Sequence, residues 1–167
     1  MAKTEQKITT EQRVDMMDVI KSRIAMVTSQ EVRVGLAGPE AKLDHVGRDG
    51  KSAGLTVEEL AAIHEYGVGV PERSFIRSTA NANHRSISRQ YQEGLRAAIR
   101  GTGGSADGLH AIGRLLSAEM KRKLEHGRLP PLAASTLADP NRDPRGLPLV
   151  DTEQILGAIG WEVKRRG

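Results

Sequence analysis

The stretch Ala61–Phe75, AAIHEYGVGVPERSF, combines a His-Glu pair, a Gly-x-Gly and a proline. An apolar stripe of helical spacing precedes it, and a long helical pattern follows it. Gly67 stands where the first helix is predicted to stop, because glycine adopts the left-handed conformation that terminates helices. Pro71 restricts the residue before it to extended geometry. The stretch therefore has three possible interpretations: a metal site, a phosphate loop or a joint between two helices.

The residues disfavour the first two interpretations. His64-Glu65 begins a metalloprotease pattern, but the second histidine would have to stand at position 68, which is Val68. Gly67-x-Gly69 follows a helix rather than a strand, unlike a dinucleotide-binding loop. The remaining histidines are not at ligand spacing from His64: His45, His84, His110 and His126. We predict that folding requires no metal and no cofactor.

Composition bounds the class of protein. The 167 residues fit one domain, which we place at residues 9–167 after a disordered N-terminus at residues 1–8. With one Phe, one Trp and two Tyr, the core must be aliphatic. The absence of cysteine excludes disulfides and thiolate nucleophiles. No apolar run is long enough to span a membrane, and the N-terminus does not resemble a signal peptide.

The segments before the joint alternate between helical and strand periods. Residues 9–12, TTEQ, form a helix-start signal. An apolar face of helical spacing follows: Val14, Met17, Ile20, Ile24 and Val27. Residues 31–37 alternate as a strand, with Val32–Leu36 as its apolar part. Residues 38–54 are predicted to be a polar loop, and Thr56 with Glu59 forms a second capping box.

The segments after the joint predict two long helices and a terminal strand. The first helix runs over residues 74–100, and the second carries an apolar face from Leu109 to Leu124. Residues 151–154 restart a short helix that includes Ile155, Leu156 and Ile159, and Trp161–Lys164 contributes a strand. We therefore predict an α+β fold, in which a small antiparallel sheet packs against two long helices.

Between the second long helix and the short one, residues 128–150 form a proline-rich arm. A loop of this length in a compact domain is usually functional or disordered. Its prolines remove backbone donors, so it cannot join a sheet centrally. Its leucines nevertheless favour a groove, and we expect the arm to contact a neighbouring subunit or ring rather than to pack wholly on its own core. The alternative is that the arm folds back across its own helices. These leucines are Leu129, Leu132, Leu137, Leu147 and Leu149.

Four arginines of the first long helix fall on one side, nearly opposite its apolar face: Arg85, Arg89, Arg96 and Arg100. This stripe is the best candidate for contact with a polyanion, and a net charge of +4 agrees with it. A solvated helix face is the alternative. No Gly-x-Ser-x-Gly or other nucleophile motif occurs, so we assign no catalytic residue and expect no enzymatic activity.

Three stretches in order resemble the tail-component and virion-morphogenesis proteins of tailed bacteriophages. The first is VEELAAIHEYG…VPERSFIR, Val57–Arg77, in which Ser74 stands where the family usually has proline. The second is PPLAASTLA, Pro130–Ala138. The third is PLVDTEQILGAIGWEV, Pro148–Val163, in which Glu153 and Ile155 replace the usual Gly and Leu.

The resemblance implies a structural protein of the virion neck, for head–tail joining or tail completion. Copies would form a ring, expected to be a hexamer, with the head connector and the tail-tube or tail-terminator protein as neighbours. The chain would be located in the virion, and in the host cytoplasm during assembly. The stretch Ala61–Phe75 is therefore interpreted as a structural joint. Its predicted residues are Gly67, which ends the first helix, Pro71, which stiffens the exit, and Arg73 and Phe75, which anchor the next helix. The rival hypothesis is a small basic module that binds nucleic acid through the arginine face.

Overall fold

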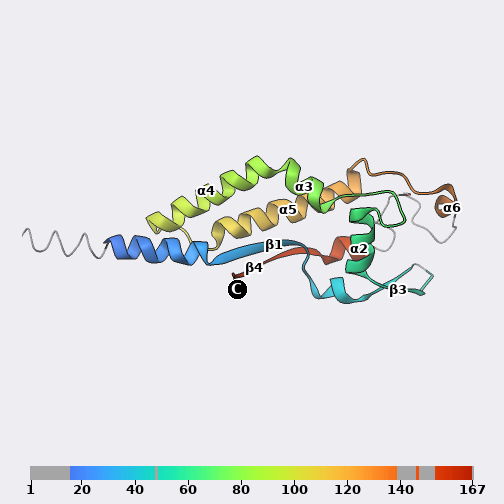
Figure 1. Cartoon of the computed structure of the whole chain (residues 1–167), viewed down its shortest axis with the longest axis horizontal. Helices are drawn as coiled ribbons and strands as arrows, with labels where there is room; N and C mark the ends of the chain where they lie inside the picture. The colour runs from blue at the N-terminus through green and yellow to red at the C-terminus, as the bar shows by residue number, and fades with distance from the viewer. Residues whose placement is uncertain (1–15, 48, 139–145, 147–152, 167) are drawn as a thin grey trace, which may run out of the picture. The chain divides into compact units, whose positions relative to one another are not determined.

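A computed structural model describes residues 16–47, 49–138, 146 and 153–166 (Figure 1). The fold is α+β, with small antiparallel strand pairs and mostly helical structure, as the sequence predicts. Two compact units are present. One consists of the described residues of Met1–Val32, Ser86–Ile112 and Val163–Gly167, and the other of those of Arg33–Arg85 and Gly113–Glu162.

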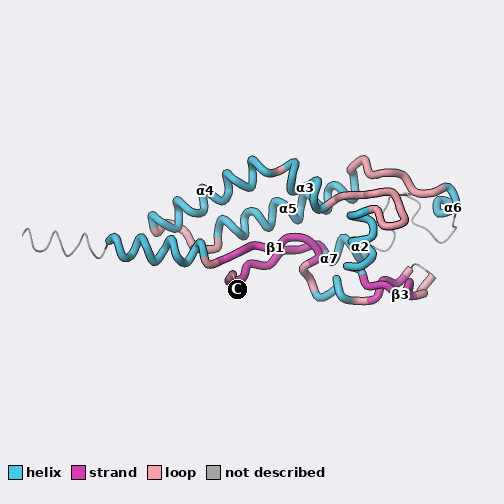
Figure 2. Tube along the Cα trace, viewed as in Figure 1, coloured by secondary structure: helices cyan, strands magenta, loops and turns pink. Residues whose placement is uncertain are grey.

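The strands form two separate pairs (Figure 2). Strand β1 (Gln30–Leu36) pairs with β4 (Ile159–Arg165), although the two are far apart in the sequence. The predicted strands at Val32–Leu36 and Trp161–Lys164 are thus confirmed. Just beyond the paired strands, the backbone N–H of Arg166 donates to the carbonyl of Ser29 at 2.7 Å.

The second pair corrects the prediction of a polar loop over residues 38–54. A short 3₁₀ helix, η1 (Pro39–Lys42), precedes an antiparallel hairpin of β2 (Asp44–Val46) and β3 (Ser52–Thr56). Its turn contains Asp49-Gly50, a dipeptide that favours hairpin turns, with Gly50 at φ 75°. The carboxylate of Asp49 accepts the N–H of Lys51 at 3.1 Å. The polar composition of residues 38–54 predicts a loop, although Asp49-Gly50 within it is a hairpin-turn signal.

Two helices are found where their patterns predict them. One covers residues 16–28, and its predicted start at residues 9–12 lies outside the described residues. The other is α2 (Val57–Tyr66), which has the predicted capping box. The Glu59 N–H donates to the Thr56 hydroxyl at 3.2 Å, and the Thr56 N–H donates to the Glu59 carboxylate at 2.8 Å. Reciprocal bonds of this kind satisfy two helix N-terminal donors.

The predicted helix over residues 74–100 is broken in two. Helix α3 (Ile76–Ala82) ends at Asn83, and α4 (His84–Arg100) begins directly after it. Asn83 has φ −103° and ψ 9°, and its side-chain amide donates to the Thr79 carbonyl at 2.9 Å. Asparagine competes for backbone groups in this way and so interrupts helices. The apolar periodicity continues across the break, which is why the sequence pattern did not show it.

Helix α5 (Asp107–His126) confirms the second long helix. Within the first unit, α4 and α5 cross at two glycines. A Cβ built on Gly94 would lie 2.5 Å from the Cα of Gly108, and one built on Gly108 would lie 2.9 Å from the Cα of Gly94. Only residues without side chains allow two helix backbones to approach this closely.

The arm and the chain end contain short helices. Helix α6 (Ala134–Leu137) lies in the arm, and α7 (Gln154–Ala158) precedes β4. The predicted helix start at residues 151 and 152 lies outside the described residues. Ile159 belongs to β4 rather than to the helix predicted for it, because the chain becomes extended there, with φ −71° and ψ 120°. None of the helices in the described part is long and apolar enough to cross a bilayer.

The cores are aliphatic, apart from one aromatic ring. In the unit that contains the joint, Phe75 is fully buried among other buried residues. These include Val57, Ala61, Leu116, Met120, Leu124, Ile155, Ala158 and Ile159. In the other unit the buried residues include Val27, Ala98, Leu109 and Ile112. The apolar stripe of α5 therefore marks a buried face. The stripe of the helix over residues 16–28 does not, because Met17 and Ile24 are exposed while Val27 is buried.

Candidate functional site: the joint between α2 and α3

The joint begins where α2 ends at Gly67. This glycine has φ 70° and ψ 37°, the left-handed conformation predicted for it, and its N–H donates to the Ile63 carbonyl. The next N–H, of Val68, donates to the same carbonyl at 2.9 Å. A Cβ at position 67 would meet the backbone N and Cα of Glu72 at 3.1 Å. The turn therefore requires glycine for its φ angle and for space.

Glu65 lies in the last turn of α2 and is only 3% exposed. Its carboxylate accepts the backbone N–H groups of the first turn of α3: from Phe75 at 2.8 Å, and from Ile76 and Arg77 at 2.9 Å. The Ser74 hydroxyl adds a bond of 2.8 Å. Phe75 stands at the N-cap of α3 and has no capping side chain. Glu65 therefore caps α3 from a different helix.

The environment of Glu65 favours its ionised form. Burial acts to raise the pKa of its carboxyl group, but the hydrogen bonds from Ile76, Arg77, Ser74 and Phe75 outweigh burial and lower the pKa below its usual value. The guanidinium Nε of Arg77 also donates to the carboxylate at 3.1 Å. A charged carboxylate at a helix N-terminus is favourable because it meets both the free N–H groups and the positive end of the helix dipole.

Arg73 is the second buried charge of the joint, at 3% exposed. Its guanidinium donates to the carbonyls of Pro130 and Pro131 at 2.9 and 2.8 Å. The predicted joint residue thus ties the beginning of the proline-rich arm to its own chain. Pro130 and Pro131 have no backbone N–H, but their carbonyls remain acceptors, and Arg73 satisfies both.

His64 contacts the same arginine. Nη1 of Arg73 lies 3.0 Å from Nδ1 of His64, and the Arg73 N–H donates to the His64 carbonyl at 2.7 Å. Because arginine can only donate, Nδ1 must accept, and the ring is neutral with its proton on Nε2. Burial, followed by the charge of Arg73, lowers the pKa of His64 from 6.5 to about 4. His64 and Glu65 are therefore occupied by internal bonds.

The other predicted joint residues divide between core and surface. Phe75 is fully buried, whereas Pro71 is exposed in the connection. Glu65, His64 and Arg77 are central to the joint, yet sequence reasoning did not assign them to it. The available signal was that α3 lacks a capping side chain at its N-cap while an acid stands ten residues earlier, at the end of α2.

The arm and the arginine stripe are located as follows. Leu129 and Leu132 are half-buried and Leu137 is 51% exposed, while Leu147 and Leu149 lie outside the described residues. The four arginines of the candidate polyanion face are all exposed on α4: Arg85, Arg89, Arg96 and Arg100. In the described part of the chain they do not take part in the joint.

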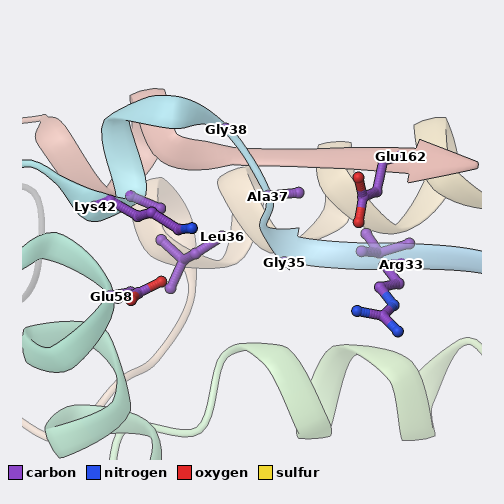
Figure 3. A pocket seen from close by; sticks show the side chains of 10 residues that line it. Arg33, Gly35, Leu36, Ala37, Gly38, Lys42, Glu58 and Glu162 are labelled. Carbon is purple, nitrogen blue, oxygen red and sulfur yellow. The ribbon is translucent and has the colours of Figure 1, made fainter.

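A cavity of about 400 Å³ lies beside β1, η1, α2 and β4 (Figure 3). Leu36 lies between Lys42 and Glu58 there, and Arg33 and Glu162 lie farther along the strands. Its two cations and two anions offset each other, and its lining contains no histidine, serine or threonine. The cavity therefore has no net charge that would select an anion. Across the described residues, no cluster of three or more His, Asp or Glu is arranged to hold a metal.

No protein-family model matches this chain, and neither the curated proteins nor the solved structures contain a significant match to it. Function must therefore be argued from the residues themselves. The Glu65 carboxylate, the Arg73 guanidinium and Nδ1 of His64 are each bonded to other parts of the same chain. Chemically, this arrangement holds helices and an arm in place.

Proposed function

We propose that this protein is a structural component of a tailed-bacteriophage neck, in which copies assemble into a ring between the head connector and the tail tube. The resemblance of Val57–Arg77, Pro130–Ala138 and Pro148–Val163 to neck proteins supplies the biological setting. The self-contained joint supports a structural rather than a catalytic role. The observation that carries the proposal is the apolar surface of the helix over residues 16–28.

Five large apolar side chains of this helix are exposed. The exposed fractions are 64% for Met16, 54% for Met17, 44% for Val19, 38% for Ile24 and 55% for Met26. Large apolar side chains exposed in this number on one helix favour a contact with another protein. Methionine suits a contact of this kind because its flexible side chain adapts to an irregular partner. We define these five residues as the apolar helix surface.

A ring requires two different surfaces on each copy that fit head to tail. The apolar helix surface would be one of them. The β1–β4 pair supports the second, since a sheet of two strands leaves one edge of each strand without a neighbouring strand among the described residues. Edge strands can pair with another chain. The exposed Leu137 of the arm would add an apolar contact.

The test is assembly of the purified protein, measured by sedimentation velocity and negative-stain electron microscopy. We expect closed rings for the wild type and loss of rings for the double variant Met17→Lys and Met26→Lys. The control is Val68→Lys, which charges an exposed apolar residue outside the helix, at 64% against 54% for Met17 and 55% for Met26. A wild type that stays monomeric at all concentrations, or rings that survive the double variant, would contradict the proposal.

A second candidate function is nucleic-acid binding by α4. Its four arginines are exposed and form no ion pair with another described residue. When arginines neutralise DNA phosphates, counterions are released, so the affinity for DNA falls steeply as the salt concentration rises. For Arg89→Gln with Arg96→Gln, we expect weaker DNA binding and a shallower salt slope, with Arg128→Gln as an exposed control outside α4. If the double variant and the control bind DNA alike, the arginine face is only a solvated surface.

A further inference from the structure

The cavity beside β1, η1, α2 and β4 is lined by two charged side chains that no other described residue engages. Lys42 and Glu58 both line it, and both are exposed. Neither side chain forms a hydrogen bond or an ion pair with another described residue. All of the lining residues belong to one compact unit. The two charges are therefore available to a partner that enters the cavity.

Between these two charges the cavity is apolar. Leu36 lies between Lys42 and Glu58 (Figure 3) and is only half-buried, although it is a large aliphatic residue of a strand. Three smaller apolar residues complete this part of the lining: Val34, Ala37 and Ala41. The cavity thus presents an apolar floor with a cation on one side and an anion on the other. Such a pattern favours a partner surface with the opposite order of charges.

The helix over residues 16–28 carries that partner pattern. Asp18 and Lys21 are 67% and 71% exposed, and they form an ion pair at 3.6 Å. At about 100° per residue, Asp18 lies opposite the buried Val27, so the pair is on the solvent side of the helix. By the same geometry two apolar flanks border it: Met17 with Ile24, and Val19 with Met26.

We propose that this helix of one copy docks across the cavity of the next copy, with Asp18 on Lys42 and Lys21 on Glu58. The inference rests on the proposed ring and specifies its second surface. Met17 precedes Asp18 and stands one helical turn before Lys21, so it enters the cavity against Leu36. Its flexible thioether adapts to the shape of the floor.

The cavity has room for side chains rather than for a whole helix. A water takes up about 30 Å³ in the liquid, so a volume of about 400 Å³ is on the order of ten waters. A helix with its side chains is about 10–12 Å wide, so it lies across the mouth while a few side chains enter. Because the docking helix and the receiving cavity are different surfaces, the contact is head to tail, as a ring requires.

Charge reversal tests the pairing at constant net charge. The cavity variant combines Lys42→Glu with Glu58→Lys, and the helix variant combines Asp18→Lys with Lys21→Asp. The first removes no ion pair and the second keeps one in reversed order, so both should remain folded by circular dichroism. Each variant alone places like charges opposite each other. We expect its self-association, measured by sedimentation velocity, to weaken by at least about tenfold.

Mixing the two variants provides the sharper test. In an equimolar mixture, every contact between unlike copies again joins opposite charges, so assembly should return to the wild-type level. The matched control is Lys121→Glu with Glu125→Lys, the same exchange on α5 outside the cavity lining, and it should assemble as the wild type does. Wild-type assembly of either variant alone, or a mixture that stays unassembled, would overturn the proposed docking.

Cross-linking separates the docking from the ring itself. The chain has no cysteine, so copies with Met17→Cys can be mixed with copies of another length that carry Lys42→Cys. Mild oxidation should join the two by a disulfide, and Lys121→Cys in place of Lys42→Cys should give no such product. The cross-link without closed rings would support the docking and contradict the ring. Closed rings that lack the cross-link and resist charge reversal would support the ring and contradict the docking.

Discussion

The carboxylate of Glu65 caps the helix that begins after Phe75, and the backbone N–H of Phe75 donates to it at 2.8 Å. The acid and the N–H groups that it binds belong to two different helices. The end of α2 thereby fixes the beginning of α3. A surface cap stabilises its own helix, whereas this buried cap also fixes the geometry between two helices. Its loss should affect the whole joint.

We expect Glu65→Gln to lower the free energy of unfolding by about 2–3 kcal/mol, because an amide NH₂ would face N–H donors and leave buried groups unsatisfied. Urea unfolding followed by circular dichroism measures the change. Glu58→Gln, on the exposed surface of the same helix, is the control and should change stability by less than about 0.5 kcal/mol. Equal stability of the two variants would show that Glu65 is not the cap described above.

The neutral state of His64 predicts a dependence of stability on pH. Its pKa is lowered to about 4 in the folded protein, against 6.5 for an unperturbed histidine. Between these values the unfolded chain binds a proton that the folded chain does not, so stability is complete above pH 6.5 and falls as the pH drops towards 4. The full shift corresponds to about 3 kcal/mol, and because the ring is only partly buried, solvent screening makes the effect on stability smaller.

The variant His64→Asn tests this dependence. Its side-chain oxygen can still accept from Arg73, but it does not titrate. We expect the free energy of unfolding of the variant to change less between pH 6.5 and 4 than that of the wild type. Urea unfolding across that range measures the difference. Parallel pH profiles for the two proteins would rule out His64 as the titrating group.

Sequence patterns predict those parts of the fold that local chemistry determines. The capping box of Thr56 and Glu59, the terminator Gly67 and the alternation in β1 each depend on neighbours within a few residues. The hairpin after η1 was also predictable, since Asp49-Gly50 is a turn signal. The polarity of the whole segment instead predicts a loop.

The candidate site was harder to predict because its bonds join distant residues. Arg73 binds the carbonyls of Pro130 and Pro131, and periodicity carries no information about such contacts. His64-Glu65 begins a metal-binding pattern that Val68 leaves incomplete, and an incomplete pattern says nothing of a structural role. The break at Asn83 depends on a competition between a side chain and the helix backbone, and a continuous apolar stripe conceals it.

Two glycines in the connection between α2 and α3 allow the energetic cost of backbone strain to be measured separately from the cost of steric crowding. Gly67 and Gly69 have φ angles of 70° and 72°. A Cβ at Gly67 would contact Glu72 at 3.0–3.1 Å, whereas a Cβ at Gly69 would meet no atom within 4 Å. Gly69→Ala should therefore cost about 1 kcal/mol for the left-handed conformation alone.

At the crowded position the same change should cost more. We expect Gly67→Ala to lower the melting temperature further than Gly69→Ala does, and Gly67→Val to lower it further still, because β-branched side chains are more crowded in this conformation. Thermal unfolding by calorimetry ranks the three variants. If Gly67→Ala and Gly69→Ala have the same melting temperature, the contact with Glu72 has no energetic role.

The close approach of Gly94 and Gly108, within one compact unit, predicts how stability responds to an added methyl group. A methyl group on Gly94 would lie 2.5 Å from the Cα of Gly108, and backbone atoms cannot move aside as a flexible side chain can. Gly94→Ala should force α4 and α5 apart and lower the free energy of unfolding by about 1–3 kcal/mol, the range for overpacked cores.

The control accounts for helix propensity. Alanine is more favourable than glycine inside a helix, so Gly94→Ala also has a stabilising contribution that opposes the destabilisation by crowding. Gly157→Ala in α7 isolates that gain, because no atom lies within 4 Å of its Cβ, and this control should gain about 0.5–1 kcal/mol. Chemical unfolding of both variants gives opposite signs if the helices are in contact at these glycines. A stabilised Gly94→Ala would mean that α4 and α5 do not approach there.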